Sequence, residues 1–157
     1  MDSGQWTEES GQWTEESGEW GEDSGDDTFF NRRNPEMSVK DYRDLILWQR
    51  ATELVVLVYE VTRDFPNDEL YGLRSQMRRA SVSIPSNIAE GQGRDTTADF
   101  LRFLSIANGS RRELETQTII AQRLDYISEQ QSEQILDLAT EVGRLRHGLA
   151  DSLKRKQ

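Results

Sequence analysis

The sequence predicts an all-α protein, an antiparallel up-and-down four-helix bundle that follows a disordered acidic N-terminal tail. From residue 41 onward, large apolar residues recur at intervals of three and four, which is the period of an amphipathic helix. No stretch alternates apolar and polar residues as a half-buried strand does. Turn-forming residues divide this region into four helices of about 23 to 30 residues, each about 35 to 45 Å long, which suits an elongated bundle.

The tail, residues 1–37, carries most of the charge of the chain. It holds eleven acidic and two basic residues, whereas residues 38–157 hold eighteen and seventeen, so the net charge of −10 is mostly a property of the tail. A unit of seven residues, SGQWTEE at Ser3–Glu9, recurs at Ser10–Glu16, in altered form at Ser17–Asp23, and degraded at Ser24–Phe30. Each unit has a glycine and few large apolar residues, which excludes a coiled-coil seam. We expect the tail to be disordered on its own.

Two interpretations of the tail stay open. It is either a solvated extension, or an arm whose tryptophans dock on a partner or on the basic surface of this protein. In the second case the tail would lie in a basic groove as a mimic of nucleic acid. Met37 precedes the helical region, so a start codon assigned too far upstream is a third interpretation. The tryptophans of the repeat are Trp6, Trp13 and Trp20.

The chain has no signal peptide pattern, no apolar run of membrane-spanning length and no cysteine. We therefore expect a cytoplasmic protein without a membrane association.

The first helix is expected over residues 41–64. Its apolar residues form two adjacent stripes, wider than one face of a small bundle needs. Either the helix is deeply buried, or the second stripe joins subunits. The first stripe contains Leu45, Trp48, Ala51, Val55 and Val58, and the second contains Leu47, Leu54, Leu57 and Val61.

The second helix is expected over residues 68–91, capped by Asn67 or Asp68 after the turn at Phe65-Pro66. Pro85 removes a backbone donor from its middle. The apolar stripe keeps its phase across the proline, so we expect a kinked but continuous helix whose loosened backbone groups bond to Ser81, Ser83 and Ser86. The stripe contains Leu70, Leu73, Met77, Ala80, Ile84 and Ile88. We expect Gly91 and Gly93 to end the helix in the left-handed conformation.

The third helix is expected over residues 95–124, capped by Asp95 or Thr96, and the fourth over residues 128–154. Small residues at 105–110 of the third helix match a small patch at 80–86 of the second, so we expect these helices to cross closely there. The fourth helix carries a seam with three- and four-residue spacing, which is typical of antiparallel bundles. Its members are Ile135, Leu138, Val142, Leu145 and Leu149.

Three segments carry a resemblance to a known family: Phe65 to Arg94, Asp44 to Ala51 and Phe103 to Gln117. They resemble the four-helix-bundle proteins encoded by intervening sequences in bacterial 23S rRNA genes, which are related to the accessory variability proteins of diversity-generating retroelements. The similarity is dense from Asp41 to Ile127 and loose over the last helix. The family usually has glycine where this chain has Asp125, so we expect that helix end to be strained or differently shaped.

The resemblance implies a homo-oligomer, often a pentameric barrel, and the retroelement relatives of the family are non-enzymatic accessory subunits. Its retroelement relatives bind a reverse transcriptase and nucleic acid. The sequence itself also argues against catalysis. The chain has one histidine, His147, and no metal-ligand spacing, phosphate loop or nucleophile motif. We expect no enzyme, no catalytic residues, no metal and no cofactor.

Arginine is the unusual component of the helical region, which has fourteen arginines and three lysines. Because guanidinium groups bind phosphate through paired hydrogen bonds, these side chains are candidate contacts to RNA, DNA or a nucleic-acid enzyme. The candidates are Arg74, Arg78, Arg79, Arg94, Arg102, Arg111 and Arg112.

The alternative is a purely structural homo-oligomer whose arginines form ion pairs within and between subunits. We expect pairs of Arg111 with Glu115, Asp99 with Arg102 and Glu141 with Arg144, and Arg79 with Glu90 across subunits. The candidate structural or subunit contacts are Pro85, Asn87, Glu90, Gly91, Trp48, Leu54 and Leu57.

Overall fold

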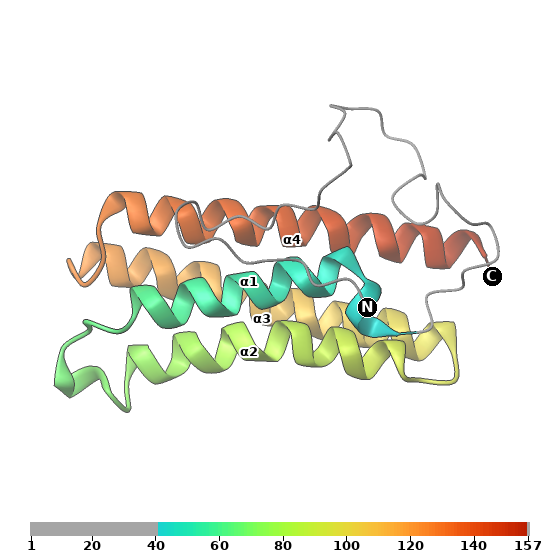
Figure 1. The fold of residues 1–157 in the computed structure, drawn as a ribbon, viewed down its shortest axis with the longest axis horizontal. Coiled ribbons are helices and arrows are strands. Elements are labelled where there is room, and N and C mark those ends of the chain that lie inside the picture. Colours follow the sequence, from blue (N-terminus) through green and yellow to red (C-terminus); the bar gives the residue numbers. More distant parts are fainter. Residues whose placement is uncertain (1–40, 157) are drawn as a thin grey trace, which may run out of the picture. The chain divides into compact units, whose positions relative to one another are not determined.

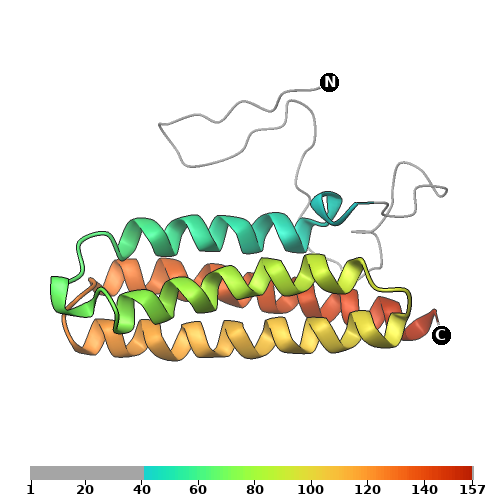
Figure 2. The ribbon, with the colours of Figure 1, turned by 90° about the horizontal axis from the view of Figure 1, so that it is seen from below.

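The computed structural model describes residues 41–156, and the predictions for the tail lie outside this range. In the described residues, four α-helices lie side by side and alternate in direction (Figure 1, Figure 2). Their bounds are Ile46–Val61 for α1, Leu73–Gln92 for α2, Thr97–Arg123 for α3 and Glu129–Arg155 for α4. Each helix packs against its neighbours in the chain, and α1 also packs against α4, which closes the bundle. The predicted all-α four-helix bundle is confirmed.

Helix α1 begins later than predicted. Residues Tyr42–Asp44 form a separate 3₁₀ turn, η2, because the carboxylate of Asp41 caps it by accepting a hydrogen bond of 2.9 Å from the Arg43 N–H. Leu45 is then extended, with ψ of 118°, so the chain changes direction before α1 starts.

The buried face of α1 draws on both predicted stripes. Leu47, Leu54 and Val61 come from the second stripe, and Ala51 and Val58 from the first. The division into a core stripe and a subunit stripe was therefore wrong, because the helical register turns a face midway between them toward the core.

The start of α2 was also predicted too early. Asn67–Glu69 form a second 3₁₀ turn, η3, and Gly72 rather than Asn67 or Asp68 is the N-cap of α2. The Glu69 carboxylate accepts a 2.7 Å hydrogen bond from the N–H of Leu73, which supplies the cap from outside the helix. Leu70 lies before the helix and is 46% exposed, so it does not belong to the apolar stripe.

Pro85 lies inside the continuous helix α2, as predicted. Side chains on both sides of it bond to backbone carbonyls: Ser81 donates to Arg78 and Ser86 donates to Val82, each at 2.8 Å. Ser83 differs from the prediction, because its hydroxyl lies 2.8 Å from the hydroxyl of Ser110 on α3. These bonds engage the Arg78 and Val82 carbonyls, whereas the carbonyl that loses its helical donor at Pro85 is that of Ser81.

Ser83 and Ser110 lie in the two patches of small residues that were expected to meet. Gly109 does not serve this contact, because a Cβ built there meets no atom within 4 Å. The tight approach is at Gly91, where a Cβ would lie 2.6 Å from the Phe103 Cβ and 2.9 Å from Phe100. Gly91 is therefore a packing residue.

The helix ends differ in how well sequence predicts them. Gly93 follows α2 with φ of −79°, so the expected left-handed cap is wrong. The caps at Thr96 and Ser128 form through their own side chains, and Gln131 completes a capping box with Ser128. Asp125 has φ of 59°, the left-handed conformation that favours glycine, which confirms the expected strain at this turn.

Candidate functional site

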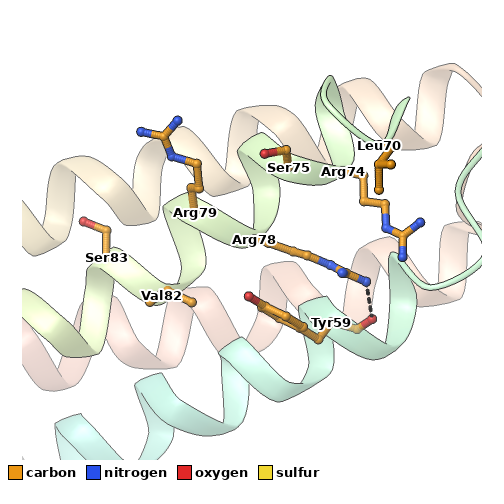
Figure 3. Close-up of a pocket in the computed structure, with 8 residues that line it drawn as sticks. All are labelled: Tyr59, Leu70, Arg74, Ser75, Arg78, Arg79, Val82 and Ser83. Atoms are coloured by element: carbon orange, nitrogen blue, oxygen red, sulfur yellow. Dashed lines mark hydrogen bonds between the residues drawn. The ribbon is translucent and has the colours of Figure 1, made fainter. Parts of the chain in front are cut away.

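The outer side of α1 and α2 carries a pocket of about 480 Å³ that contains three of the candidate arginines (Figure 3). We call it the arginine pocket. No carboxylate lines it, so the three guanidinium charges are not neutralised within the lining. The pocket is lined by Tyr59, Leu70, Arg74, Ser75, Arg78, Arg79, Val82 and Ser83.

Arg78 is held in place by α1. Its Nε donates a 2.9 Å hydrogen bond to the buried Thr62 hydroxyl, and its Nη2 donates to the Tyr59 carbonyl at 3.3 Å. The guanidinium also lies 4.5 Å from the centre of the Tyr59 ring, in a cation–π contact (Figure 3). These neutral partners orient the guanidinium without cancelling its charge.

Arg74 and Arg79 have unused donors. The Nε of Arg74 is buried and has no hydrogen-bond partner within residues 41–156. Arg79 is exposed and forms no ion pair with the described residues. Figure 3 shows Arg74 and Arg79 extending from α2 in different directions. The pocket therefore presents separated positive groups along α2, which suits an extended anion better than a small one.

A second pocket of about 320 Å³ continues the first along the same two helices. We call it the aromatic pocket, because Tyr42 and Trp48 line it and their rings pack edge to face at 5.3 Å. Val82 lines both pockets, so they are adjacent, and we call the two together the α1–α2 groove. The remaining lining residues of the aromatic pocket are Thr52, Val55, Pro85, Ser86 and Ala89.

Arg94 and Arg102 do not join this groove. Arg94 pairs with Glu90 one turn earlier in sequence and lies 4.7 Å from the centre of the Phe103 ring. Arg102 is exposed on α3, and the expected pair with Asp99 is absent from the described residues, because Asp99 accepts from Thr96 instead. Glu90 is thus already paired within the chain, and its pair with Arg79 across subunits stays a prediction.

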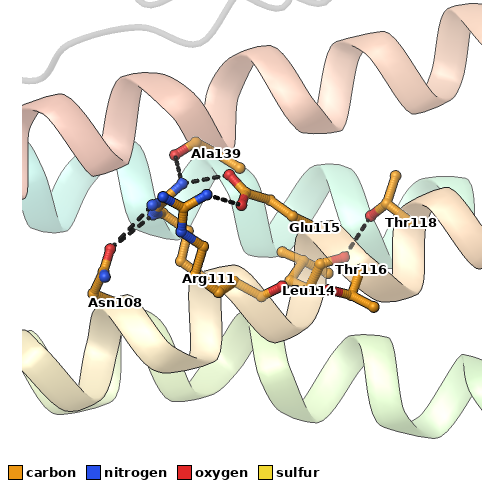
Figure 4. A network of polar contacts seen from close by, with 8 residues as sticks. Asn108, Arg111, Leu114, Glu115, Thr116, Thr118 and Ala139 are labelled. Carbon is orange, nitrogen blue, oxygen red and sulfur yellow. Dashed lines mark hydrogen bonds and ion pairs between the residues drawn. The ribbon is translucent and has the colours of Figure 1, made fainter.

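Arg111 was misassigned as a surface contact. It is 7% exposed and lies between α3 and α4, where it pairs with Glu115 and donates to Asn108 Oδ1 at 3.1 and 3.2 Å (Figure 4). It also donates to the Ala139 carbonyl at 3.4 Å. Burial lowers the pKa of Arg111 from its usual value, although Glu115 opposes that shift. Arg111 is therefore a structural residue.

The other expected ion pairs have mixed outcomes. The pair of Arg111 and Glu115 is confirmed, and Arg112 also contacts Glu115 at 3.3 Å. Glu141 does not pair with Arg144, because Arg50 of α1 holds its carboxylate with hydrogen bonds of 2.7 and 2.9 Å. This bond links α1 to α4 across the bundle.

The structure also places the candidate structural contacts. Leu54 is fully buried in the core and is therefore not available to another subunit, whereas Pro85 is largely buried and lines the aromatic pocket. Trp48 and Leu57 are half-buried against the core. Asn87 bonds to the Ser83 carbonyl one turn earlier.

Sequence reasoning missed two kinds of residue. Tyr59 and Thr62 of α1 orient Arg78 of α2. These contacts depend on how α1 packs against α2, and no local sequence signal predicts that packing. Gly143 was also missed, although an unexplained glycine inside a helix is a usable signal. A Cβ there would lie 2.9 Å from Arg111 Cζ, so this glycine makes room for the buried guanidinium.

Within residues 41–156, no helix combines the length and the apolar character that a membrane span requires. The same residues hold no group of three or more His, Cys, Asp or Glu side chains arranged for a metal ion.

Comparisons with known proteins agree with the fold. A similar solved structure is that of a protein with unknown function from the S23 ribosomal protein family of Bacteroides thetaiotaomicron VPI-5482. It has a TM-score of 0.63 and 24% sequence identity, and the match covers 67% of this chain and 98% of that one. No curated protein matches this chain. The family profile of the 23S rRNA-intervening sequence proteins matches residues 43–148, and the chain therefore belongs to that family.

Proposed function

We propose that this protein is a cytoplasmic, non-enzymatic, homo-oligomeric scaffold that binds the phosphate backbone of nucleic acid through the arginine pocket. The observation that carries the proposal is that three arginines line one surface pocket without a carboxylate among the lining residues. Guanidinium groups bind phosphate oxygens through charge-assisted hydrogen bonds, and Arg79 is exposed in this lining.

The charge balance of the bundle indicates that nucleic acid would be attracted by the arginine pocket and not by the surface as a whole. Residues 38–157 have eighteen acidic and seventeen basic residues, so the bundle as a whole does not attract a polyanion. Binding therefore has to depend on the few phosphates that reach the pocket. Repetition of the pocket around an oligomer would raise the affinity by allowing several contacts at once. The resemblance to pentameric relatives, some of which bind a reverse transcriptase, motivates this part of the proposal.

The test is filter binding of a 20-nucleotide mixed-sequence RNA to the full chain across a salt series. The variant is Arg74→Gln with Arg79→Gln, and the matched control is Arg123→Gln with Arg144→Gln, two exposed arginines outside the groove. Loss of two phosphate contacts should flatten the slope of log affinity against log salt by about 1.4 for a single strand. Equal slopes for the groove variant and the control would reject the proposal.

The second candidate function is a structural oligomer whose arginines serve subunit contacts. Exposed apolar side chains on α1 and α2 favour it, including Val56 and the groove-lining residues Tyr59 and Val82. Light scattering of the same variants separates the two functions. A groove variant that keeps the subunit number but loses RNA supports the first function, whereas one that dissociates supports the second.

A further inference from the structure

The two pockets of the α1–α2 groove differ in the chemistry that they offer to a ligand. Three arginines and no carboxylate line the arginine pocket, whereas no charged residue lines the aromatic pocket. The first suits anionic groups and the second suits flat, neutral groups. We propose that the groove binds nucleic acid as a single strand, whose bases stack on Tyr59 and Trp48 while its phosphates contact the arginines. This binding mode rests on the proposed function, because the same arginines hold the phosphates.

Tyr59 brings an aromatic ring into the arginine pocket. It is 44% exposed, and the guanidinium of Arg78 lies 4.5 Å from the centre of its ring (Figure 3). Thr62 holds that guanidinium through a 2.9 Å hydrogen bond, so Arg78 stays beside the ring. Bases of any sequence stack on aromatic side chains, because every base has a π face. Tyr59 and Arg78 therefore place a stacking surface and a positive charge side by side.

Tyr42 and Trp48 present a second aromatic surface, in the aromatic pocket. Their rings pack edge to face, with centres 5.3 Å apart and planes at 66°. Both side chains also pack against the hydrophobic core, so the rings are held in place before a ligand arrives. Stacking on such preorganised rings costs little side-chain entropy. Because the lining carries no charge, a neutral base enters without removing an ion from water.

The spacing of the two rings fits a short strand. Trp48 and Tyr59 are eleven residues apart on α1, which corresponds to about 16 Å of helix. Successive nucleotides of a stacked strand rise by about 3.4 Å, so about five nucleotides span this distance. In a duplex the bases are paired and stacked on one another, and only unpaired bases reach aromatic side chains. The groove therefore favours a single strand over a duplex of the same sequence.

The test compares three ligands of the full chain by filter binding. They are a 20-nucleotide mixed-sequence RNA, the same RNA annealed to its complement, and an abasic RNA strand of the same length, which keeps the phosphates and lacks the bases. One stacked base contributes a factor of about 5 to 100 in affinity. We expect the single strand to bind about ten-fold more tightly than either of the other two, although the duplex carries more charge.

Substitutions separate stacking from charge. Tyr59→Leu and Trp48→Leu should each weaken binding of the single strand about ten-fold and leave the abasic strand unchanged. The affinity should fall by the same factor at every salt concentration, because the slope of log affinity against log salt depends on phosphate contacts. The matched control is Tyr71→Leu, which removes a ring that is 92% exposed and lines neither pocket, and it should bind as the unchanged protein does.

The failures of the two proposals are distinguishable. Equal binding of the single strand and the abasic strand overturns the stacking, and this comparison uses the unchanged protein, so it holds even if Trp48→Leu fails to fold. Tighter binding of the duplex also overturns it, as does a flatter salt slope for Tyr59→Leu, because the ring would then act only by positioning Arg78. In each of these cases, weaker binding by Arg74→Gln with Arg79→Gln still supports the proposed function. If none of the three ligands binds, both proposals are rejected.

Discussion

Gly143→Ala should destabilise the protein even though it replaces glycine in a helix. Alanine in place of a helical glycine ordinarily stabilises by up to about 1 kcal/mol. At Gly143 the new Cβ would lie 2.9 Å from Arg111 Cζ and 3.1 Å from its Nε and Nη1, where ordinary contacts begin at 3.4 Å. The guanidinium therefore has to move away from the partners that hold it.

The cost follows from those partners. Arg111 donates to Asn108 and to the Ala139 carbonyl and pairs with Glu115, all in a buried place. A hydrogen bond of a charged group contributes about 1.5 to 3 kcal/mol, so loss of one or two outweighs the gain in helix propensity. We expect a net loss of about 1 to 3 kcal/mol in the free energy of unfolding. At about 2 kcal/mol per molar urea, a loss of 2 kcal/mol moves the urea midpoint by about 1 M.

The control lies on the same helix. Gly148 has open space around a built Cβ, so Gly148→Ala should stabilise by up to about 1 kcal/mol. In an Arg111→Met background, Gly143→Ala should also become stabilising, because the obstructing guanidinium is gone. Urea unfolding followed by circular dichroism measures the unchanged protein and the four variants, which are Gly143→Ala, Gly148→Ala, Arg111→Met and the double variant. Gly143→Ala and Gly148→Ala changing stability alike would refute the reasoning.

Three further predictions follow from local contacts. Glu69→Gln weakens the cap of α2 and should cost about 1 kcal/mol. It should also bring the pKa of Tyr126 down toward its usual 10.0, because the hydrogen bond to the Glu69 carboxylate raises that pKa. In the unchanged protein, the stability that Tyr126 contributes is present below pH 10 and is lost as the pH rises through the raised pKa of Tyr126. Glu69→Gln should remove this pH dependence, which ultraviolet titration and unfolding at alkaline pH will test. Asp125→Gly should stabilise by about 1 kcal/mol, because Asp125 has a positive φ, and a lower midpoint in thermal unfolding would contradict this. Thr62→Val should release Arg78 from its hydroxyl partner and weaken RNA binding several-fold, whereas unchanged affinity would show that this orientation is unimportant.

Periodicity predicted the four helices because each must bury one apolar face. Local side-chain chemistry predicted the cap of α3, because Thr96 accepts a hydrogen bond from a backbone N–H three residues later. The capping box of Ser128 and Gln131 at the start of α4 was not predicted, although it is equally local. The start of α2 was predicted wrongly, because its cap comes from Glu69, outside the helix.

The candidate site was predicted only where its residues are close in sequence. Arg74, Arg78 and Arg79 lie within two turns of α2, so a linear reading grouped them correctly. Arg111 looked equivalent in the sequence, but its burial depends on Gly143, thirty-two residues later on another helix. Charge alone does not distinguish a surface arginine from one that fills a space between two helices.

Glu69 has a consequence for how the molecule unfolds. One carboxylate oxygen binds the start of α2, and the other accepts a 3.2 Å hydrogen bond from the hydroxyl of Tyr126 in the turn between α3 and α4. Phe65, in the connection between α1 and α2, also packs on the Tyr126 ring at 5.4 Å. The N-terminal and C-terminal helical hairpins thus share an attachment at one end, so separating them requires both connections to loosen together. Amide protons at that end should exchange with solvent through one cooperative opening rather than through independent fraying of each hairpin.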